Sequence, residues 1–246
     1  MPSLSMPSLT SLPALLIPLI VAGCGRQPPD GGSAQSPAQP PFAARVESVR
    51  EERLDAITVT DRLLDPGDWE RLRGLTGLRE LVLEQGRADD GRAEILATLT
   101  GLERLVLRES PLGDAGFQRI AECHTLRDVN VPKAACTAAG VRALAALPHL
   151  RSLRLGGAHL TGPDICEAIA SLPQLRSLHL IDVPIGDDGL AVLQRPPGLW
   201  NLYLDGAGVS DEAWERYFQA CPRVHVHIDQ AHHDRDPRGH LHEQAP

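Results

Sequence analysis

Apolar residues recur every 24 or 25 positions between residues 54 and 228, and this period dominates the sequence. Each copy reads Leu-x-x-Leu-x-Leu, with valine at two positions of one copy, and is followed by a loop and an apolar stretch with helical spacing. A fixed period of this length is typical of a solenoid, because no single unit can bury its apolar face alone. A degenerate copy (Leu54, Ile57, Val59) comes first, and a strand over residues 224–228 closes the series. The clear copies begin at Leu78, Leu102, Leu126, Leu150, Leu175 and Leu199.

Each repeat is predicted to contain one strand and one helix. When the first leucine is counted as offset zero, offsets three and five alternate as in a strand with one buried face. Offset ten is apolar again, and residues such as Val141, Leu144 and Leu147 then follow helical spacing. At the predicted start of each helix, a carboxylate is expected to cap the first helical turn. These carboxylates include Asp114, Asp187, Asp188 and Asp211.

The repeat resembles that of the leucine-rich repeat superfamily over roughly residues 54–228. Its Asp-x-Gly-Leu helix start is most similar to the longer, helix-bearing subclasses, those like ribonuclease inhibitor and the Cys-containing repeats. The resemblance implies an α/β solenoid with a curved parallel sheet on its concave face and helices on its convex face, used mostly to bind proteins. One position departs from the superfamily: the residue after each strand, often Asn or Cys there, is small or apolar here. These residues are Gly86, Ser110, Ala134, Ala158, Val183 and Ala207.

The amino-terminal segment, residues 1–23, is predicted to be a lipoprotein-type signal peptide. It has no charged side chain, and its apolar run from Leu12 to Ala22 is shorter than the roughly 20 apolar residues that span a bilayer. The run ends in Val-Ala-Gly followed by Cys24, which resembles a bacterial lipobox. The resemblance implies that Cys24 is lipidated and anchors a membrane-bound lipoprotein, periplasmic or at the cell surface. A plain cleaved signal and an unprocessed apolar start are the alternatives.

The remaining chain divides into four predicted parts. Residues 24–41 are rich in Pro, Gly, Ser and Gln and are expected to form a disordered tether. Residues 42–53 mix Val46 and Val49 with charges and are expected to cap the first repeat, as either a helix or a strand. The leucine-rich repeat domain is assigned to residues 54–230, and a His-rich disordered tail to residues 231–246.

Composition narrows the function. The chain has 246 residues and 42% hydrophobic content, enough for a single elongated domain, which we expect to be a monomer. A net charge of −8 and 3% aromatic residues disfavour a nucleic-acid partner. The sequence lacks a Gly-rich phosphate loop, a Gly-x-Ser-x-Gly elbow and a His-Glu-x-x-His motif, and its carboxylates recur at one repeat offset. We therefore expect neither an enzyme nor a cofactor.

Four cysteines follow Cys24, and they are predicted to be small apolar residues of the solenoid core. They lack the Cys-x-x-Cys spacing of zinc and redox sites. A disulfide among them stays open, because spacing alone does not supply its geometry. The four are Cys123, Cys136, Cys166 and Cys221.

Six of the ten histidines fall in the last 22 residues. His225 and His227 are predicted to project from one side of the closing strand, and His232 and His233 follow them. Imidazole pairs of this kind suit zinc, copper or nickel, so an envelope metal-binding protein is the alternative function. A polar end strand with a disordered tail is the simpler interpretation.

The binding surface is predicted from the strand offsets that point away from the core. Offset four reads Val82, Val106, Asn130, Arg154, His179 and Tyr203, all expected to point away from the core onto the concave face. Arg154 is expected to be exposed there. Offset one reads Arg127, Arg151, Arg176 and Trp200 in the later repeats. Because Arg, Tyr and Trp are enriched at interface hot spots, we predict a partner site at Arg154, Arg176, His179, Trp200 and Tyr203. A merely solvated sheet face is the alternative.

Eight strands spaced about 4.8 Å apart give a face about 34 Å long, which suits a protein or peptide better than a small molecule. The sequence therefore predicts a non-enzymatic protein-binding leucine-rich repeat module, tethered to a bacterial membrane by a lipidated cysteine. A passive structural lipoprotein without a specific ligand is a third interpretation.

Overall fold

The computed structural model describes residues 40–232. The predicted signal peptide, Cys24, all of the predicted tether except its last two residues, and the tail from His233 onward lie outside the described residues. Within residues 40–232, no helix is both long enough and apolar enough to cross a membrane.

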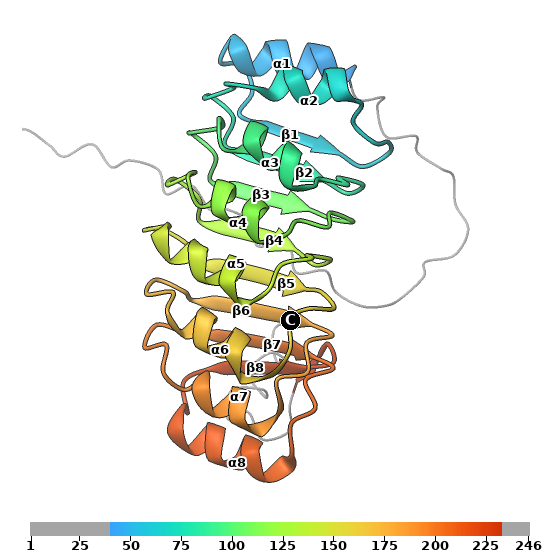
Figure 1. Cartoon of the computed structure of the whole chain (residues 1–246). Coiled ribbons are helices and arrows are strands. Elements are labelled where there is room, and N and C mark those ends of the chain that lie inside the picture. Colours follow the sequence, from blue (N-terminus) through green and yellow to red (C-terminus); the bar gives the residue numbers. More distant parts are fainter. Residues whose placement is uncertain (1–39, 233–246) are drawn as a thin grey trace, which may run out of the picture. The chain divides into compact units, whose positions relative to one another are not determined.

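The described chain forms a sheet of nine strands stacked in sequence order (Figure 1). Strands β1 to β8 are parallel, and β9 pairs antiparallel with β8. The strands are β1 Ala56–Val59, β2 Glu80–Leu83, β3 Arg104–Leu107, β4 Asp128–Val131, β5 Ser152–Gly156, β6 Ser177–Ile181, β7 Asn201–Asp205, β8 His225–Ile228 and β9 Ala231–His232.

A helix follows each strand from β1 to β7, and the helices form a file along one face of the sheet (Figure 1). One further helix, α1, precedes β1. The helices are α1 Phe42–Arg50, α2 Pro66–Leu72, α3 Asp90–Leu96, α4 Asp114–Ile120, α5 Ala138–Ala143, α6 Gly162–Ala170, α7 Gly186–Val192 and α8 Asp211–Ala220, with a short 3₁₀ turn at Leu144–Ala146 after α5.

Strand register follows the repeat, because equal offsets of successive copies pair with one another. Leu81 pairs with Leu105, Leu105 with Val129, and Val129 with Leu153. Side chains alternate between the two faces of a strand, so this register stacks the offset-three residues into one buried file. The predicted period is thus confirmed as one turn of an α/β solenoid.

The core runs without a break between the sheet and the helices, from Phe42 to Val226. The leucines that begin the clear copies are all buried, and so is the apolar offset-ten residue of most repeats, such as Leu112 and Leu160. The degenerate first copy is different. Leu54 is 45% exposed, whereas Ile57 and Val59 of the same copy are buried, which agrees with the degenerate character of this copy.

The cap before the first repeat is a helix, which settles the choice that the sequence leaves between helix and strand. Helix α1 packs against α2 and buries Phe42, Val46 and Val49 at the end of the core. Asp65 directly precedes helix α2 and caps it, because its carboxylate accepts the backbone N–H of Asp68 at 2.8 Å. A cap of this kind covers the apolar edge that the first repeat would otherwise expose.

The last parallel strand is followed by a tight hairpin. Asp229 and Gln230 both have positive φ, 49° and 64°, as a two-residue turn between antiparallel strands requires. The turn brings Ala231–His232 back against β8 as strand β9. The predicted tail of residues 231–246 therefore begins too early by these two residues, which belong to the sheet.

Aspartates at the start of one helix bind the start of the next helix. Asp114 Oδ1 accepts the backbone N–H of Thr137 at 2.8 Å and that of Gly140 at 2.9 Å. Asp90 Oδ1 accepts the N–H groups of Gly113 and Gly116 at 2.7 and 3.0 Å. The sequence predicts carboxylate caps, but it places them in their own helices. Stacking of the repeats instead puts each of these carboxylates at the amino terminus of the following helix, where unpaired N–H groups collect.

The same link joins the last two helices. Asp187 accepts the backbone N–H and the hydroxyl of Ser210, at 2.8 and 2.7 Å. Ser210 in turn caps its own helix by accepting the N–H of Ala213 at 3.2 Å. Asp188, beside Asp187 in the first turn of α7, is exposed. The predicted capping role thus holds for some of these carboxylates and acts between repeats.

Candidate functional site

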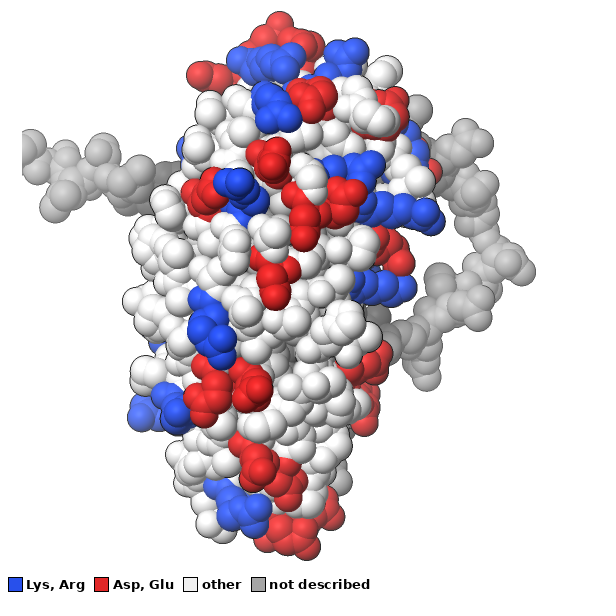
Figure 2. All heavy atoms as spheres, in the orientation of Figure 1, with Lys and Arg blue, Asp and Glu red and all other residues white. Residues whose placement is uncertain are grey.

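The sheet face opposite the helices, here called the open face, carries offsets two, four and six of each strand. In its amino-terminal half, charges on neighbouring strands pair with each other. Arg104 lies 3.5 Å from Glu80, and Arg108 lies 3.0 Å from Glu84. Figure 2, which views the molecule from the helix side, shows acidic and basic side chains interleaved near α1 and α2 as well. Such exposed pairs contribute about 0–1 kcal/mol each, so they balance charge more than they hold the fold.

Two valines lie between these ion pairs in the register. Val82 and Val106 occupy offset four and are 9% and 4% exposed, although they lie outside the continuous core. The sequence predicts that offset four points away from the core, and the structure shows in addition that these two valines are shielded from solvent. Long Arg and Glu side chains at the flanking offsets have apolar stems that cover neighbouring apolar surface. This half of the open face therefore neutralises its own charges and covers its own apolar groups.

The carboxyl-terminal half carries a row of polar and aromatic side chains at offset four, here called the polar ladder. Register places Asn130, Arg154, His179, Tyr203 and His227 side by side on β4 to β8. The ring centroids of His179 and Tyr203 lie 5.4 Å apart, and the rings of Tyr203 and His227 stack at 4.7 Å. All five side chains are partly buried. The ladder is a continuous strip that crosses five strands.

Asp205 fixes the orientation of His179. His179 Nε2 lies 2.8 Å from Asp205 Oδ2, so the neutral imidazole donates its hydrogen from Nε2. Burial lowers the pKa of His179, the hydrogen bond to Asp205 raises it and the charge of Arg154 lowers it, with a net value below the ordinary one. At neutral pH the ladder therefore presents an uncharged imidazole beside a charged guanidinium.

Two polar atoms of the ladder lack a partner within the described chain. Asn130 Oδ1 and Arg154 Nε are buried and have no hydrogen-bond partner among the described residues. Burial and the nearby Arg108 lower the pKa of Arg154, although a guanidinium keeps its charge in proteins. Arg154 was expected to be exposed, but it is partly buried. Buried polar groups without partners are rare and mark positions whose role needs an explanation.

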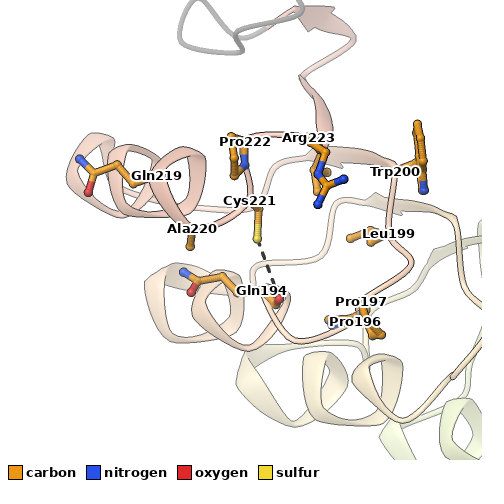
Figure 3. Close-up of a pocket in the computed structure, with 11 residues that line it drawn as sticks. Gln194, Pro196, Pro197, Leu199, Trp200, Gln219, Ala220, Cys221, Pro222 and Arg223 are labelled. Atoms are coloured by element: carbon orange, nitrogen blue, oxygen red, sulfur yellow. Dashed lines mark hydrogen bonds between the residues drawn. The ribbon is translucent and has the colours of Figure 1, made fainter.

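Arg176 and Trp200 lie away from the ladder, at the edge of the sheet where the strands begin. Arg176 Nη1 donates to the carbonyl oxygen of Gly198 at 3.2 Å, and Trp200 is 56% exposed. Trp200 lines a hollow of about 590 Å³ between the last two repeats (Figure 3). Its other walls include Pro196, Pro197, Cys221 and Arg223. The five predicted partner residues therefore fall in two places: three in the ladder and two at this edge.

The described cysteines are free. Cys123, Cys136 and Cys166 are buried in the core, which confirms the predicted packing role, and Cys221 is partly buried. Burial raises the pKa of the Cys123 thiol to about 11 and the pKa values of Cys136 and Cys166 to about 12. Thiols of this kind are inert at neutral pH.

The predicted histidine pair comes together. His225 Nε2 and His227 Nε2 lie 2.6 Å apart on β8. His232 stands opposite His227 in the register of the β8–β9 hairpin, and His233 lies outside the described residues. Among the residues that the structure describes, no group of three or more His, Cys, Asp or Glu is arranged to hold a metal ion.

Solved structures share this architecture. A leucine-rich repeat protein of Leptospira interrogans aligns at a TM-score of 0.50 and 18% identity, covering 74% of this chain and 50% of that one. The plant peptide hormone receptor RGFR1 in complex with RGF2 aligns at a TM-score of 0.48 and 16% identity, covering 74% of this chain and 29% of the receptor. The chain thus spans half or less of the length of these two proteins. No family model and no curated protein matches the sequence.

The chain has the leucine-rich repeat fold. The Leptospira alignment agrees with the register of the eight parallel strands, each paired with the next copy at equal offset. At this level of identity the likeness concerns the fold alone. The role of the open face therefore has to be argued from the side chains of this chain.

Asn130 and Asp205 belong to the candidate site on the open face, but the sequence did not single them out. Asn130 stands in the offset-four file, but asparagine alone gives no sign that its oxygen is left without a partner. Asp205 lies at offset six, 26 residues after His179, and the two meet only because the repeats stack. A comparison of offset four with offset six in the next copy is the sequence signal that identifies such pairs.

Proposed function

We propose that this protein is a non-enzymatic binding module that takes a protein or peptide partner along the polar ladder. The observation that carries the proposal is the contrast between the two halves of the open face. The amino-terminal half pairs its charges between strands. The ladder instead holds Asn130 Oδ1 and Arg154 Nε without hydrogen-bond partners in the described chain.

An extended peptide fits the chemistry of this strip. Each peptide residue brings a carbonyl oxygen and, except for proline, an N–H group, which complement the donor of Arg154 and the acceptor of Asn130. Tyr203 and its stacked neighbours add a flat apolar surface of the kind that anchors interfaces. Five strands at about 4.8 Å spacing give a ladder about 19 Å long, which matches about six residues of extended chain.

The experiment begins with a peptide or protein captured by crosslinking in intact cells, and then measures its affinity for purified variants. Arg154→Ala and Tyr203→Ala are each expected to weaken binding about thirtyfold or more, since truncation of a central Arg or aromatic anchor costs about 2 kcal/mol. Arg119→Ala, on an exposed position of α4, is the matched arginine control and is expected to leave the affinity unchanged.

The edge residues provide the second arm of this experiment. If Arg176→Ala and Trp200→Ala weaken binding while Arg154→Ala and Tyr203→Ala do not, the partner binds at the hollow and the ladder proposal is wrong. If none of the four variants changes the affinity, the open face is not the binding surface. A loss confined to Arg154 and Tyr203 supports the ladder.

We also propose that a lipid on Cys24 tethers the module to a bacterial membrane, in the periplasm or at the cell surface. The support is the Val-Ala-Gly-Cys motif at residues 21–24, followed by a stretch rich in Pro, Gly and Ser. Cys24→Ser is expected to move the protein from the membrane fraction to the soluble fraction without unfolding it. Cys221→Ser is the control that stays with the membrane. An unmodified Met1 terminus in the mass spectrum of the mature protein would contradict this part of the proposal.

A further inference from the structure

Arg154 carries a positive charge that has no counter-ion within the described chain. On the amino-terminal half of the open face, Arg104 pairs with Glu80 at 3.5 Å and Arg108 pairs with Glu84 at 3.0 Å. The guanidinium of Arg154, by contrast, makes neither a salt bridge nor a hydrogen bond with any residue that the structure describes. The ladder therefore holds an arginine whose anion has to come from outside this part of the chain.

Asp205 is close enough to attract Arg154 but does not pair with it. Its Oδ2 lies 2.8 Å from His179 Nε2, so this carboxylate is already bonded. Burial and then the charge of Arg108 lower the pKa of Arg154, and Asp205 raises it by less. The surroundings thus disfavour the charged guanidinium. A charge held in this way is costly unless an anion pairs with it.

The outer end of the Arg154 side chain is accessible. Of its three nitrogens, only Nε is both buried and unpaired within the described chain. The two Nη atoms make no hydrogen bond with the described residues either, so they reach solvent. Their N–H groups form a planar fork that matches the two oxygens of a carboxylate. A single carbonyl oxygen fills only part of this fork and brings no formal charge.

Short neighbours leave room beside this fork. On the same face of β5, Arg154 is flanked by Ser152 and by Gly156, which has no side chain. Ser177 is the register partner of Ser152 on the next strand. Asp128 on β4 is an acid on this face, and it already accepts a hydrogen bond from Ser152. A group that approaches Arg154 therefore meets small side chains and an acid that is already bonded.

The place of Arg154 in the ladder favours an acid within a peptide over the end of one. Arg154 is the second of the five ladder residues, between Asn130 on β4 and His179 on β6. Asn130 Oδ1 lacks a partner in the described chain and can accept an N–H group. A peptide that contacts both residues continues past Arg154. The carboxylate at Arg154 then belongs to a side chain.

We propose that Arg154 selects partners that carry an acidic side chain, Asp or Glu, in an extended segment bound along the polar ladder. The inference rests on the proposed peptide binding and adds the chemical class of the partner. A carboxylate on the Nη fork supplies the counter-ion that the described chain does not. Arg154 therefore disfavours the folded state when the site is empty and becomes paired only in the complex.

The test measures binding of short peptides to the purified full chain. Two pools of N-acetylated, amidated hexapeptides are identical except that each position in turn is fixed as Glu or as Gln. At one position or more, the Glu pool is expected to bind the parent at least about tenfold more tightly, because hydrogen bonds between charged groups are about twice as strong as neutral ones. Arg154→Gln is expected to abolish this difference. Arg104→Gln, at an exposed arginine of the same face that pairs with Glu80, is the matched control and keeps it.

The outcomes separate this inference from the proposed function. Equal binding of the Glu and Gln pools would leave peptide binding intact and overturn the selection of an acid. A preference for Glu that persists in Arg154→Gln would place the acid elsewhere and overturn the role of Arg154. Binding only of hexapeptides with a free carboxyl terminus would assign the carboxylate to the chain end, against the proposal. Absence of all peptide binding would contradict the proposed function itself.

Two further readouts keep the test independent of a folding defect. Arg154→Gln is expected to melt at the temperature of the parent or above it, because the change removes a charge that has no counter-ion. Arg154→Lys keeps the charge but loses the planar fork, so it is expected to retain only part of the preference for Glu. A clearly lower melting temperature in Arg154→Gln would show that the guanidinium supports the fold, and would overturn its assignment to a ligand.

Discussion

The carboxylate of Asp114 occupies the space that a side chain on Gly140 would need. Oδ1 accepts the backbone N–H of Gly140 at 2.9 Å, and a Cβ built on Gly140 would lie 2.6 Å from that same oxygen. Asp90 stands in the same relation to Gly116. Gly116 of the Asp-x-Gly motif, and Gly140 at the same offset of the next repeat, therefore each make room for the aspartate of the preceding repeat.

This relationship reverses the usual effect of alanine in a helix. Alanine normally stabilises a helix by about 1 kcal/mol relative to glycine. Gly140→Ala is instead expected to destabilise the protein by about 1–3 kcal/mol, because the new methyl group is overpacked against Asp114 and Cys136. Urea unfolding measures the change. Gly91→Ala in α3 is the control, with its nearest contact at 3.5 Å, and should be neutral or stabilising. Similar stabilisation at both positions would refute the contact.

Removal of the acid itself tests the link between repeats. Asp114→Ala is expected to cost about 0.5–2 kcal/mol, the range for a lost helix cap. Burial raises the pKa of Asp114, but hydrogen bonds from Thr137 and Gly140 outweigh this effect and hold it below its ordinary value of 3.8. The contribution of Asp114 to stability is therefore present above about pH 3.8, and it is lost as the pH falls through the lower pKa that Asp114 has in the folded protein. The difference from the parent should be constant at neutral pH and shrink in acid. Asp188→Ala, in the first turn of α7 and exposed, should change stability by less than about 0.5 kcal/mol.

The strand register gives a third prediction. Leu153 is 1% exposed at offset three of a central repeat, so Leu153→Ala is expected to cost about 2–5 kcal/mol. Arg151 is exposed at offset one, and Arg151→Ala should stay within about 0.5 kcal/mol. Chemical denaturation of both variants compares the two positions. Losses of equal size would mean that the strand faces are assigned wrongly.

His179 makes stability depend on pH near neutrality. Its pKa in the folded protein is lowered from the ordinary 6.5, so below that value the unfolded chain takes up a proton that the folded chain resists. Stability should therefore fall as pH drops through 6.5 and level off below the folded pKa. His179→Gln is expected to flatten this part of the profile, measured with a chelator present to keep metal out. His159→Gln, which removes an exposed histidine, should keep the slope of the parent. An unchanged slope in His179→Gln would mean that other groups cause the dependence.

Thiol reactivity tests whether the core between the repeats excludes solvent and reagents. In a Cys24→Ser background, a thiol reagent is expected to modify Cys221 first, because it is only partly buried and lines the edge hollow. Cys123, Cys136 and Cys166 should react only after denaturation, since they are buried and their pKa values lie at about 11 and 12. Mass spectrometry of digested protein locates the labels. Labelling of Cys136 in the native protein would show that the central repeats open.

The sequence predicts the repeat well, because burial of one strand face and one helix face forces apolar residues to fixed offsets. It predicts the positions of the ladder residues Arg154, His179 and Tyr203 for the same reason. It does not predict that Arg154 is partly buried, since exposure on a sheet face depends on the lengths of neighbouring side chains.

Contacts between repeats are the other part that the sequence leaves open. The hydrogen bonds of Asp114 with Gly140 and of His179 with Asp205 join consecutive repeats. They depend on how closely one repeat packs on the next, and a pattern within one repeat does not contain this information. Trp200 does not lie among the ladder residues, because offset one is at the edge of the sheet where the strands begin. A pattern of offsets does not separate the edge of a sheet from its face.

The carboxylate links also give the stack a direction. In each of these links, the aspartate belongs to the earlier repeat and accepts N–H groups of the later one. Because synthesis proceeds from the amino end, each accepting carboxylate leaves the ribosome before the N–H groups that it binds. Cutting repeats from the carboxyl end uncovers apolar surface and acids that water solvates readily. Removal of repeats from the amino end exposes similar apolar surface. It also removes the aspartate that accepts the N–H groups at the start of the next helix. Shortened chains that keep the amino end are therefore the ones expected to fold.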